Sequence, residues 1–192
     1  MTPLFGRYQY RILTNAEFYP LMAELQPKVV PKTLSYQSIV MLSMFERVEL
    51  QKLAKNLGNH WRLNLGIYHD DEMIGWHSGE QADVQTYQMG STMLAPDHRS
   101  LGVYSALLPE IVKLVSDKGF LVIRSKQHAN NNAALIPKLK AGFSVTGLEV
   151  SDEQGIMLQV NYYMQRLRQQ MYEFRTGARI PDEKLSVWLP KP

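Results

Sequence analysis

The residues that could do chemistry gather between Met93 and Phe143. An apolar stretch ends at Pro96, and the segment Arg99–Val103 (RSLGV) then leads into an apolar helix. The first N–H groups of a helix have no partner within it and carry the positive end of its dipole, so this loop could hold a pyrophosphate. Gly102 would let the backbone approach that anion closely, although it could equally serve only a tight turn.

A second motif follows at a fixed distance. Asn131-x-x-Ala134 opens another helical stretch, and Gly142-Phe143 ends it. The order of proline, Arg-x-x-Gly, helix, strand, Asn-x-x-Ala and Gly-Phe resembles the GCN5-related N-acetyltransferase (GNAT) superfamily over about residues 85–165. The resemblance implies an α/β fold with a mixed, mainly antiparallel central sheet and helices on both faces. It also implies an enzyme that moves an acetyl group from acetyl-CoA to a primary amine by direct attack on the thioester.

The same resemblance implies where acetyl-CoA would bind as a co-substrate, without a metal. The loop matches the segment whose backbone N–H groups hold the pyrophosphate, and the preceding strand end matches the one that pairs with the pantetheine arm. Asn131 matches the side chain that bonds the pantetheine region. Residues 99–140 carry 7 basic and 2 acidic residues, which suits a polyphosphate. The predicted cofactor-binding residues are Thr92, Met93, Leu94, Arg99, Ser100, Leu101, Gly102, Val103, Tyr104 and Asn131.

Two positions depart from the family pattern. Tyr104 stands where the family has a small residue, which adds bulk beside the expected phosphate. Lys138 stands where many members carry a tyrosine that protonates the leaving thiolate. A lysine could donate that proton if burial lowered its pKa, but a plain surface cation is the expectation. Pro137 beside it removes an N–H from the helix.

The candidate catalytic residues are Glu80 as the base and Tyr163 as the acid that replaces the missing tyrosine. The attack itself needs only a neutral amine, donors that polarise the thioester carbonyl and a route for one proton. Other candidates share these roles, and each also has a structural explanation as a turn, strand or core residue. They are Asp83 and His77 for the base, and Tyr87 and Tyr162 for the acid.

Composition narrows the class of protein. The 192 residues suit one domain, with 45% hydrophobic and 20% charged residues. Cysteine is absent, which excludes disulfides and thiolate sites, and none of the five histidines pairs at metal-ligand spacing. An apolar run long enough for a membrane helix or a signal peptide is also absent, so a cytoplasmic protein without a membrane partner is expected.

Charge and pattern suggest how the chain is organised. Residues 1–164, with 15 basic and 15 acidic residues, are predicted to form a single acetyltransferase-like domain. Residues 165–192, with 6 basic and 3 acidic residues, would form a basic C-terminal extension. That extension is either a loosely packed tail or an inter-subunit arm, which would imply a homodimer. The basic excess is too weak to indicate nucleic-acid binding.

Local patterns predict the elements that position these residues. Thr14 and Glu17 have capping-box spacing before the first helix. Apolar residues at helical spacing, Met41 and Met44 among them, predict a second helix that packs in the core. The predicted strands are 8–13, 61–67, 73–83, 85–94, 120–123 and 158–164, and the predicted helices are about 15–26, about 37–56, one after the loop, and 130–140.

Two other functions fit the same residues. The domain could bind acyl-CoA as a sensor or structural protein with little or no turnover, a reading that Lys138 and Tyr104 favour. It could also act as an interaction module through its C-terminal extension. The sequence does not name the acceptor, which would be the amine of a small molecule or of a protein.

Overall fold

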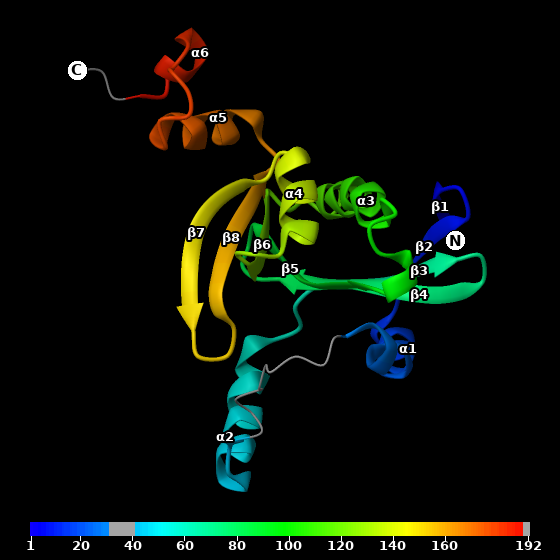
Figure 1. Ribbon diagram of the computed structural model, residues 1–192. Coiled ribbons are helices and arrows are strands. Elements are labelled where there is room, and N and C mark those ends of the chain that lie inside the picture. Colours follow the sequence, from blue (N-terminus) through cyan, green and yellow to red (C-terminus); the bar gives the residue numbers. More distant parts are fainter. Residues whose placement is uncertain (31–40, 190–192) are drawn as a thin grey trace.

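The structure, a computed structural model, describes residues 1–30 and 41–189. Its centre is an eight-stranded sheet in the order β1-β2-β3-β4-β5-β6-β8-β7 (Figure 1). The parallel neighbours in this sheet are β5 and β6, and the other neighbours are antiparallel. The predicted α/β class with a mixed, mainly antiparallel sheet is therefore confirmed. The strands are β1 (Thr2–Phe5), β2 (Tyr8–Leu13), β3 (Arg62–His69), β4 (Glu72–Gln81), β5 (Thr86–Leu94), β6 (Val122–His128), β7 (Ser144–Ser151) and β8 (Gly155–Tyr163).

Helices cover both faces of the sheet. On one face, α3 buries Leu107, Leu108 and Ile111 against the strands, and α4 lies beside it (Figure 1). On the other face, α1 packs Phe18 against Trp76. The two faces thus carry two separate hydrophobic clusters. The helices are α1 (Asn15–Val29), α2 (Met44–Ala54), α3 (Val103–Asp117), α4 (Asn132–Lys140), α5 (Arg166–Arg175) and α6 (Glu183–Ser186).

The first helix begins where the capping box predicts. The Thr14 N–H donates to the Glu17 carboxylate at 2.8 Å, and the Glu17 N–H donates to Thr14 Oγ1 at 3.3 Å. The predicted end near residue 26 is too early, because Pro27 lies inside the helix, which continues to Val29. Pro27 removes only its own N–H from the helix, and the Val30 N–H still donates to the Gln26 carbonyl at 3.0 Å.

The second helix differs most from its prediction. It begins at Met44 after a capping box between Ser43 and Glu46, and residues 37–40 of the predicted span lie outside the described residues. Met41, Met44 and Phe45 are 75%, 81% and 73% exposed, so the prediction that they pack in the core is wrong. Helical periodicity predicts a helix but not the surface that covers it.

No helix within residues 1–30 and 41–189 is long and apolar enough to cross a membrane.

The sequence patterns missed two edge strands and shortened a third. β1 and β7 form the two edges of the sheet, and neither was predicted. Neither strand has a fully buried residue, so neither carries the alternation of apolar and polar residues that marks a half-buried strand. β6 extends to His128 rather than ending near Ile123. The sequence does not predict its second half as a strand, because the side chains there are polar and face α4 or solvent.

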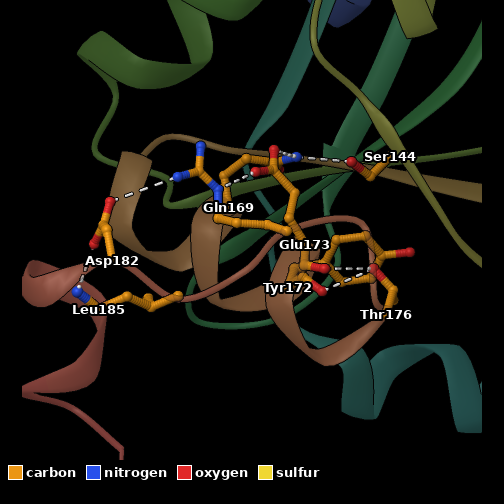
Figure 2. A network of polar contacts seen from close by, with 8 residues as sticks. Ser144, Gln169, Tyr172, Glu173, Thr176, Asp182 and Leu185 are labelled. Carbon is orange, nitrogen blue, oxygen red and sulfur yellow. Dashed lines mark hydrogen bonds and ion pairs between the residues drawn. The ribbon is translucent and has the colours of Figure 1, made fainter.

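The C-terminal extension is folded rather than loose. Gln169 on α5 donates to Ser144 Oγ on β7 at 2.8 Å and to the Glu173 carboxylate at 3.1 Å (Figure 2). Arg179 donates to Glu173 at 2.9 Å, and this hydrogen bond is the main reason that the Glu173 pKa is lowered. Leu185 on α6 is completely buried. These contacts attach α5 and α6 to the rest of the fold, and the inter-subunit arm stays a prediction.

Candidate functional site

The two parallel strands at the centre of the sheet part halfway along their length. β5 and β6 are in register from Thr86↔Val122 to Met89↔Ser125, and no later pair joins them in the described chain. Beyond that point β5 remains paired to β4, and β6 remains paired to β8. The facing backbone groups of the parted segments do not bind each other, so a ligand can take them. The predicted strand end Thr92–Leu94 forms one edge of this parting.

A β-bulge marks the point where the strands part. Ser78 pairs with Ser91 and Gly79 pairs with Met89, which leaves Gly90 as an extra residue in β5. A Cβ on Gly90 would lie 2.9 Å from the Ser78 carbonyl oxygen, so a larger residue does not fit without a shift. Bulges bend a strand and increase its local twist, which accounts for the turn of β5 away from β6.

The predicted pyrophosphate loop ends in an uncapped helix start. Ser100 and Gly102 have positive φ angles of 60° and 85°, and among the described residues no side chain caps α3. The first α3 hydrogen bond to this loop runs from the Ala106 N–H to the Gly102 carbonyl at 3.0 Å. The N–H groups of the preceding helical residues therefore have no acceptor within the helix. Such a cluster of N–H groups is suited to an anion.

Arg99 holds this loop in place. Its Nε donates to the Leu94 carbonyl at 2.9 Å, and its Nη2 donates to the Val29 carbonyl at 2.6 Å. The side chain thus ties the loop to the end of β5 and to the last turn of α1. Of the loop side chains, Val103 is fully buried and Leu101 is exposed. The backbone, rather than the Arg99 side chain, is therefore what the loop presents to a ligand.

The remaining predicted cofactor residue opens α4. Asn131 is exposed, and its Oδ1 accepts a hydrogen bond from the Ala134 N–H at 3.3 Å. Tyr104 packs against the main hydrophobic cluster, with its ring centroid 5.9 Å from the Lys138 ammonium nitrogen. The bulk of Tyr104 is therefore turned into the protein, which removes the expected crowding at the loop.

Lys138 is buried, so the prediction of a surface cation is wrong. Its side chain is only 5% exposed, and Nζ donates to Ser125 Oγ at 2.7 Å and to Gln127 Oε1 at 2.6 Å. Burial lowers the pKa of Lys138 to about 8. Ser125 is the last β6 residue in register with β5. The ammonium group therefore lies where the two strands part, on the face that α3 and α4 cover.

A neutral histidine braces the neighbouring strands on the same face. His77 is completely buried, with Nδ1 2.8 Å from Thr92 Oγ1 and Nε2 2.8 Å from the Tyr87 hydroxyl. Burial, reinforced by the positive charge of Lys138, lowers the His77 pKa to about 3. Burial also raises the pKa of Tyr87. Both rings are thus fixed in the core, away from solvent.

The opposite face carries a hollow at the same place in the sheet. Its volume is about 250 Å³, and the Glu80 carboxylate accepts from Arg62 Nη2 there at 2.7 Å. Ser91 in its wall accepts a hydrogen bond from Trp76 Nε1 at 3.0 Å, and Trp76 belongs to the α1 cluster. The hollow therefore opens on the α1 face. Its lining residues are Arg62, Ser78, Gly79, Glu80, Gln88, Gly90 and Ser91.

Other predicted catalytic residues lie elsewhere. Tyr163 pairs with Val122 at the far end of β6, and its ring lies against Arg168 and Tyr172 from α5. The structure thus does not bring Tyr163 together with Glu80. Asp83 accepts hydrogen bonds from the backbone N–H groups after it, which lower its pKa and fix the turn before β5.

The fold has many counterparts among solved structures. The ribosomal-protein-S18-alanine N-acetyltransferase from Escherichia coli superimposes with a TM-score of 0.60 at 15% identity, covering 82% of this chain and 94% of that one. A putative acetyltransferase from Salmonella typhimurium with acetyl-CoA gives 0.59 at 15% identity, covering 84% and 96%. A GNAT family acetyltransferase from Elizabethkingia anophelis with acetyl-CoA bound gives 0.57 at 12% identity, covering 83% and 100%.

Sequence comparison is more specific about the family. No curated protein matches the chain in sequence. A family model described as "Acetyltransferase (GNAT) family" matches residues 33–143, which is more than half of the chain. That span contains the parted strands, the loop before α3, the start of α4 and Lys138. The chain therefore belongs to the GNAT family of acetyltransferases.

Proposed function

We propose that the protein transfers an acetyl group from acetyl-CoA to a primary amine of a small molecule or a protein. The observation that carries this proposal is the parting of β5 and β6 at Gly90, with an uncapped helix start beyond it. The pantetheine arm would take the free backbone edge at Thr92–Leu94. The pyrophosphate would take the N–H groups between Arg99 and Tyr104. Asn131 would bond the cofactor from the start of α4.

Two ionisable groups on opposite faces of the sheet support this reaction. Glu80, in the hollow on the α1 face, would accept a proton from the attacking amine. Lys138, on the α3 and α4 face, would give a proton to the departing sulfur. The amine nitrogen then bonds to the acetyl carbon, and the carbon–sulfur bond breaks. The products are an N-acetyl compound and the free thiol of CoA.

Lys138 suits the role of acid better than the tyrosines considered from the sequence. Its pKa of about 8 leaves it mostly protonated at neutral pH, yet close enough to the working pH to release the proton. Tyr87 has a raised pKa and its hydroxyl is held by His77. Tyr163 lies at the other end of β6.

Thiol release tests the proposed activity directly. Purified protein with acetyl-CoA and a panel of amines, including simple alkylamines, amino acids and peptides, is expected to release free CoA only when an amine is present. Mass spectrometry should detect the matching N-acetyl product. Binding of acetyl-CoA without release for any amine would instead favour the acyl-CoA sensor.

The loop makes a separate prediction about cofactor binding. Gly102→Val places a β-branched residue at φ 85°, a strain of about 1–3 kcal/mol that the loop would relieve by changing conformation. The Kd for acetyl-CoA, measured by calorimetry, is therefore expected to rise by about tenfold or more.

Gly119→Val provides the matched control. Gly119 follows the opposite end of α3, also has a positive φ of 102°, and also has open space where a Cβ would stand. It should carry similar backbone strain without changing acetyl-CoA binding. Equal losses of affinity in the two variants would show that strain in α3, rather than the loop, is responsible.

A further inference from the structure

The hollow on the α1 face contains an accessible pair of opposite charges. Arg62 Nη2 and Glu80 Oε2 are 2.7 Å apart, and their side chains are 42% and 47% exposed. They are cross-strand partners on β3 and β4, and both line the hollow beside Gly90. Because the pair is open to water, breaking it costs little free energy. A ligand carboxylate can then take the place of Glu80 at Arg62, and a ligand ammonium group can take the place of Arg62 at Glu80.

The surroundings hold Arg62 while leaving donors free. Its Nη1 donates to the Tyr19 hydroxyl of α1 at 2.5 Å, which fixes the guanidinium at the edge of the hollow. A guanidinium has five N–H donors, so Arg62 can keep the Tyr19 contact and still bind a carboxylate. The other wall residues Ser78, Gln88 and Ser91 are uncharged and polar.

The two charges define the kind of acceptor that fits. A ligand with only an ammonium group would bind Glu80 and leave Arg62 without its partner beside a second positive charge. A ligand with only a carboxylate would leave Glu80 in the same position. A ligand that carries both charges on one carbon replaces the pair completely, because Arg62 and Glu80 lie next to each other.

We infer that the acceptor is a free α-amino acid, whose carboxylate binds Arg62 and whose amino group binds Glu80 at the hollow beside Gly90. This rests on the proposed function, since it names the substrate class of the same site. In this position the amino group lies where β5 bends away from β6. Glu80 then takes a proton from the ammonium group, and the nitrogen attacks the thioester carbon. The nitrogen then loses its second proton to water, the carbon–sulfur bond breaks, and the sulfur takes a proton from Lys138, which water reprotonates.

Matched acceptors test the role of the carboxylate. Acetyl-CoA turnover is measured with alanine, serine, glutamine and methionine, each beside its carboxamide, and with β-alanine and a short peptide. The free amino acids are expected to exceed their carboxamides in kcat/KM by about tenfold or more. β-Alanine and the peptide should resemble the carboxamides, because their carboxylate is farther from the amine.

Two variants separate binding from chemistry. Arg62→Gln is expected to raise KM for the amino acids to the level of the carboxamides, so that the ratio of kcat/KM between each amino acid and its carboxamide falls to about one. Glu80→Gln should lower kcat for both sets. Arg11→Gln is the matched control, because Arg11 also pairs with a glutamate, Glu17, and its side chain is 41% exposed outside the hollow. It should leave the preference for amino acids unchanged.

The possible failures are distinguishable. Equal kcat/KM for amino acids and carboxamides, or a preference that survives Arg62→Gln, would overturn the inference while leaving the acetyltransferase intact. Efficient acetylation of the peptide would assign the hollow to protein N-termini instead. Absence of turnover with every amine, despite acetyl-CoA binding, would overturn the proposed function together with the inference.

Discussion

Lys138→Met is expected to lower kcat by about 10²- to 10³-fold with little change in the Kd for acetyl-CoA. Methionine keeps the length and apolar stem of the side chain but has no proton to give to the sulfur of CoA. Lys138 Nζ donates hydrogen bonds to Ser125 and Gln127, at the point where β6 leaves β5. Removing the ammonium group should therefore slow the chemical step rather than weaken cofactor binding. The measurement is steady-state thiol release with both substrates saturating, beside calorimetric binding of acetyl-CoA.

The pH dependence identifies the role of this lysine. A general acid works in its protonated form, so the contribution of Lys138 should be full below its pKa of about 8 and should disappear above it. The ratio of native to Lys138→Met kcat removes the titration of the acceptor amine, which is common to both proteins. That ratio should fall about tenfold for each pH unit above 8.

A matched variant controls for the loss of a charge. Lys140→Met removes a lysine from the last turn of the same helix, but Lys140 is exposed. Its kcat and pH profile should match the native protein. Thermal melting of both variants checks that the fold persists. A ratio that stays constant with pH would mean that Lys138 supports the packing of α4 on β6 rather than supplying a proton.

The parts of the site that follow from sequence are those with local signals. Pro96, Gly102, Asn131 and Gly142 each mark a turn or a helix end by their backbone preferences, and their order led to the GNAT family. The family, the mixed α/β sheet and an enzyme of the acetyltransferase class are confirmed. The roles of the individual cofactor residues stay predictions, since they depend on where a ligand lies.

The parts that do not follow from sequence depend on packing between distant segments. Lys138 and Lys140 are equivalent in a nine-residue helix until α4 is placed on β6, where one is covered and the other is not. The sequence does not indicate a role for Arg62, because its pairing with Glu80 depends on the β3–β4 register. That register shifts at a bulge between Ile67 and Tyr68, which no sequence signal revealed. His77, predicted as a candidate base, is a neutral core residue because it is buried on the face that α3 and α4 cover.

Gly79→Ala is expected to destabilise the protein by about 2–4 kcal/mol. A Cβ there would lie 2.2 Å from the Tyr87 hydroxyl oxygen, 2.5 Å from its ring carbon Cζ and 2.6 Å from the Gln88 carbonyl oxygen. Tyr87 is fully buried, and its hydroxyl forms a hydrogen bond with His77 Nε2. The ring can therefore move only by breaking that hydrogen bond inside the core. Urea unfolding followed by tryptophan fluorescence measures the loss, and the melting temperature should fall by about 5–15 °C.

Gly147→Ala separates this overlap from the general effect of a methyl group on a strand glycine. Gly147 on β7 has ordinary space, with its nearest neighbour, Gln159, 3.8 Å from the added Cβ. The free energy of unfolding of the Gly147→Ala variant should differ from that of the native protein by less than about 1 kcal/mol, in either direction. Because Tyr87 holds His77, and His77 in turn contacts Thr92, the Gly79→Ala variant should weaken acetyl-CoA binding as well. If Gly79→Ala were as stable as Gly147→Ala, then β4 and β5 could move apart here without loss of stability. The close packing of Gly79 against Tyr87 would then not hold the end of β5 in place.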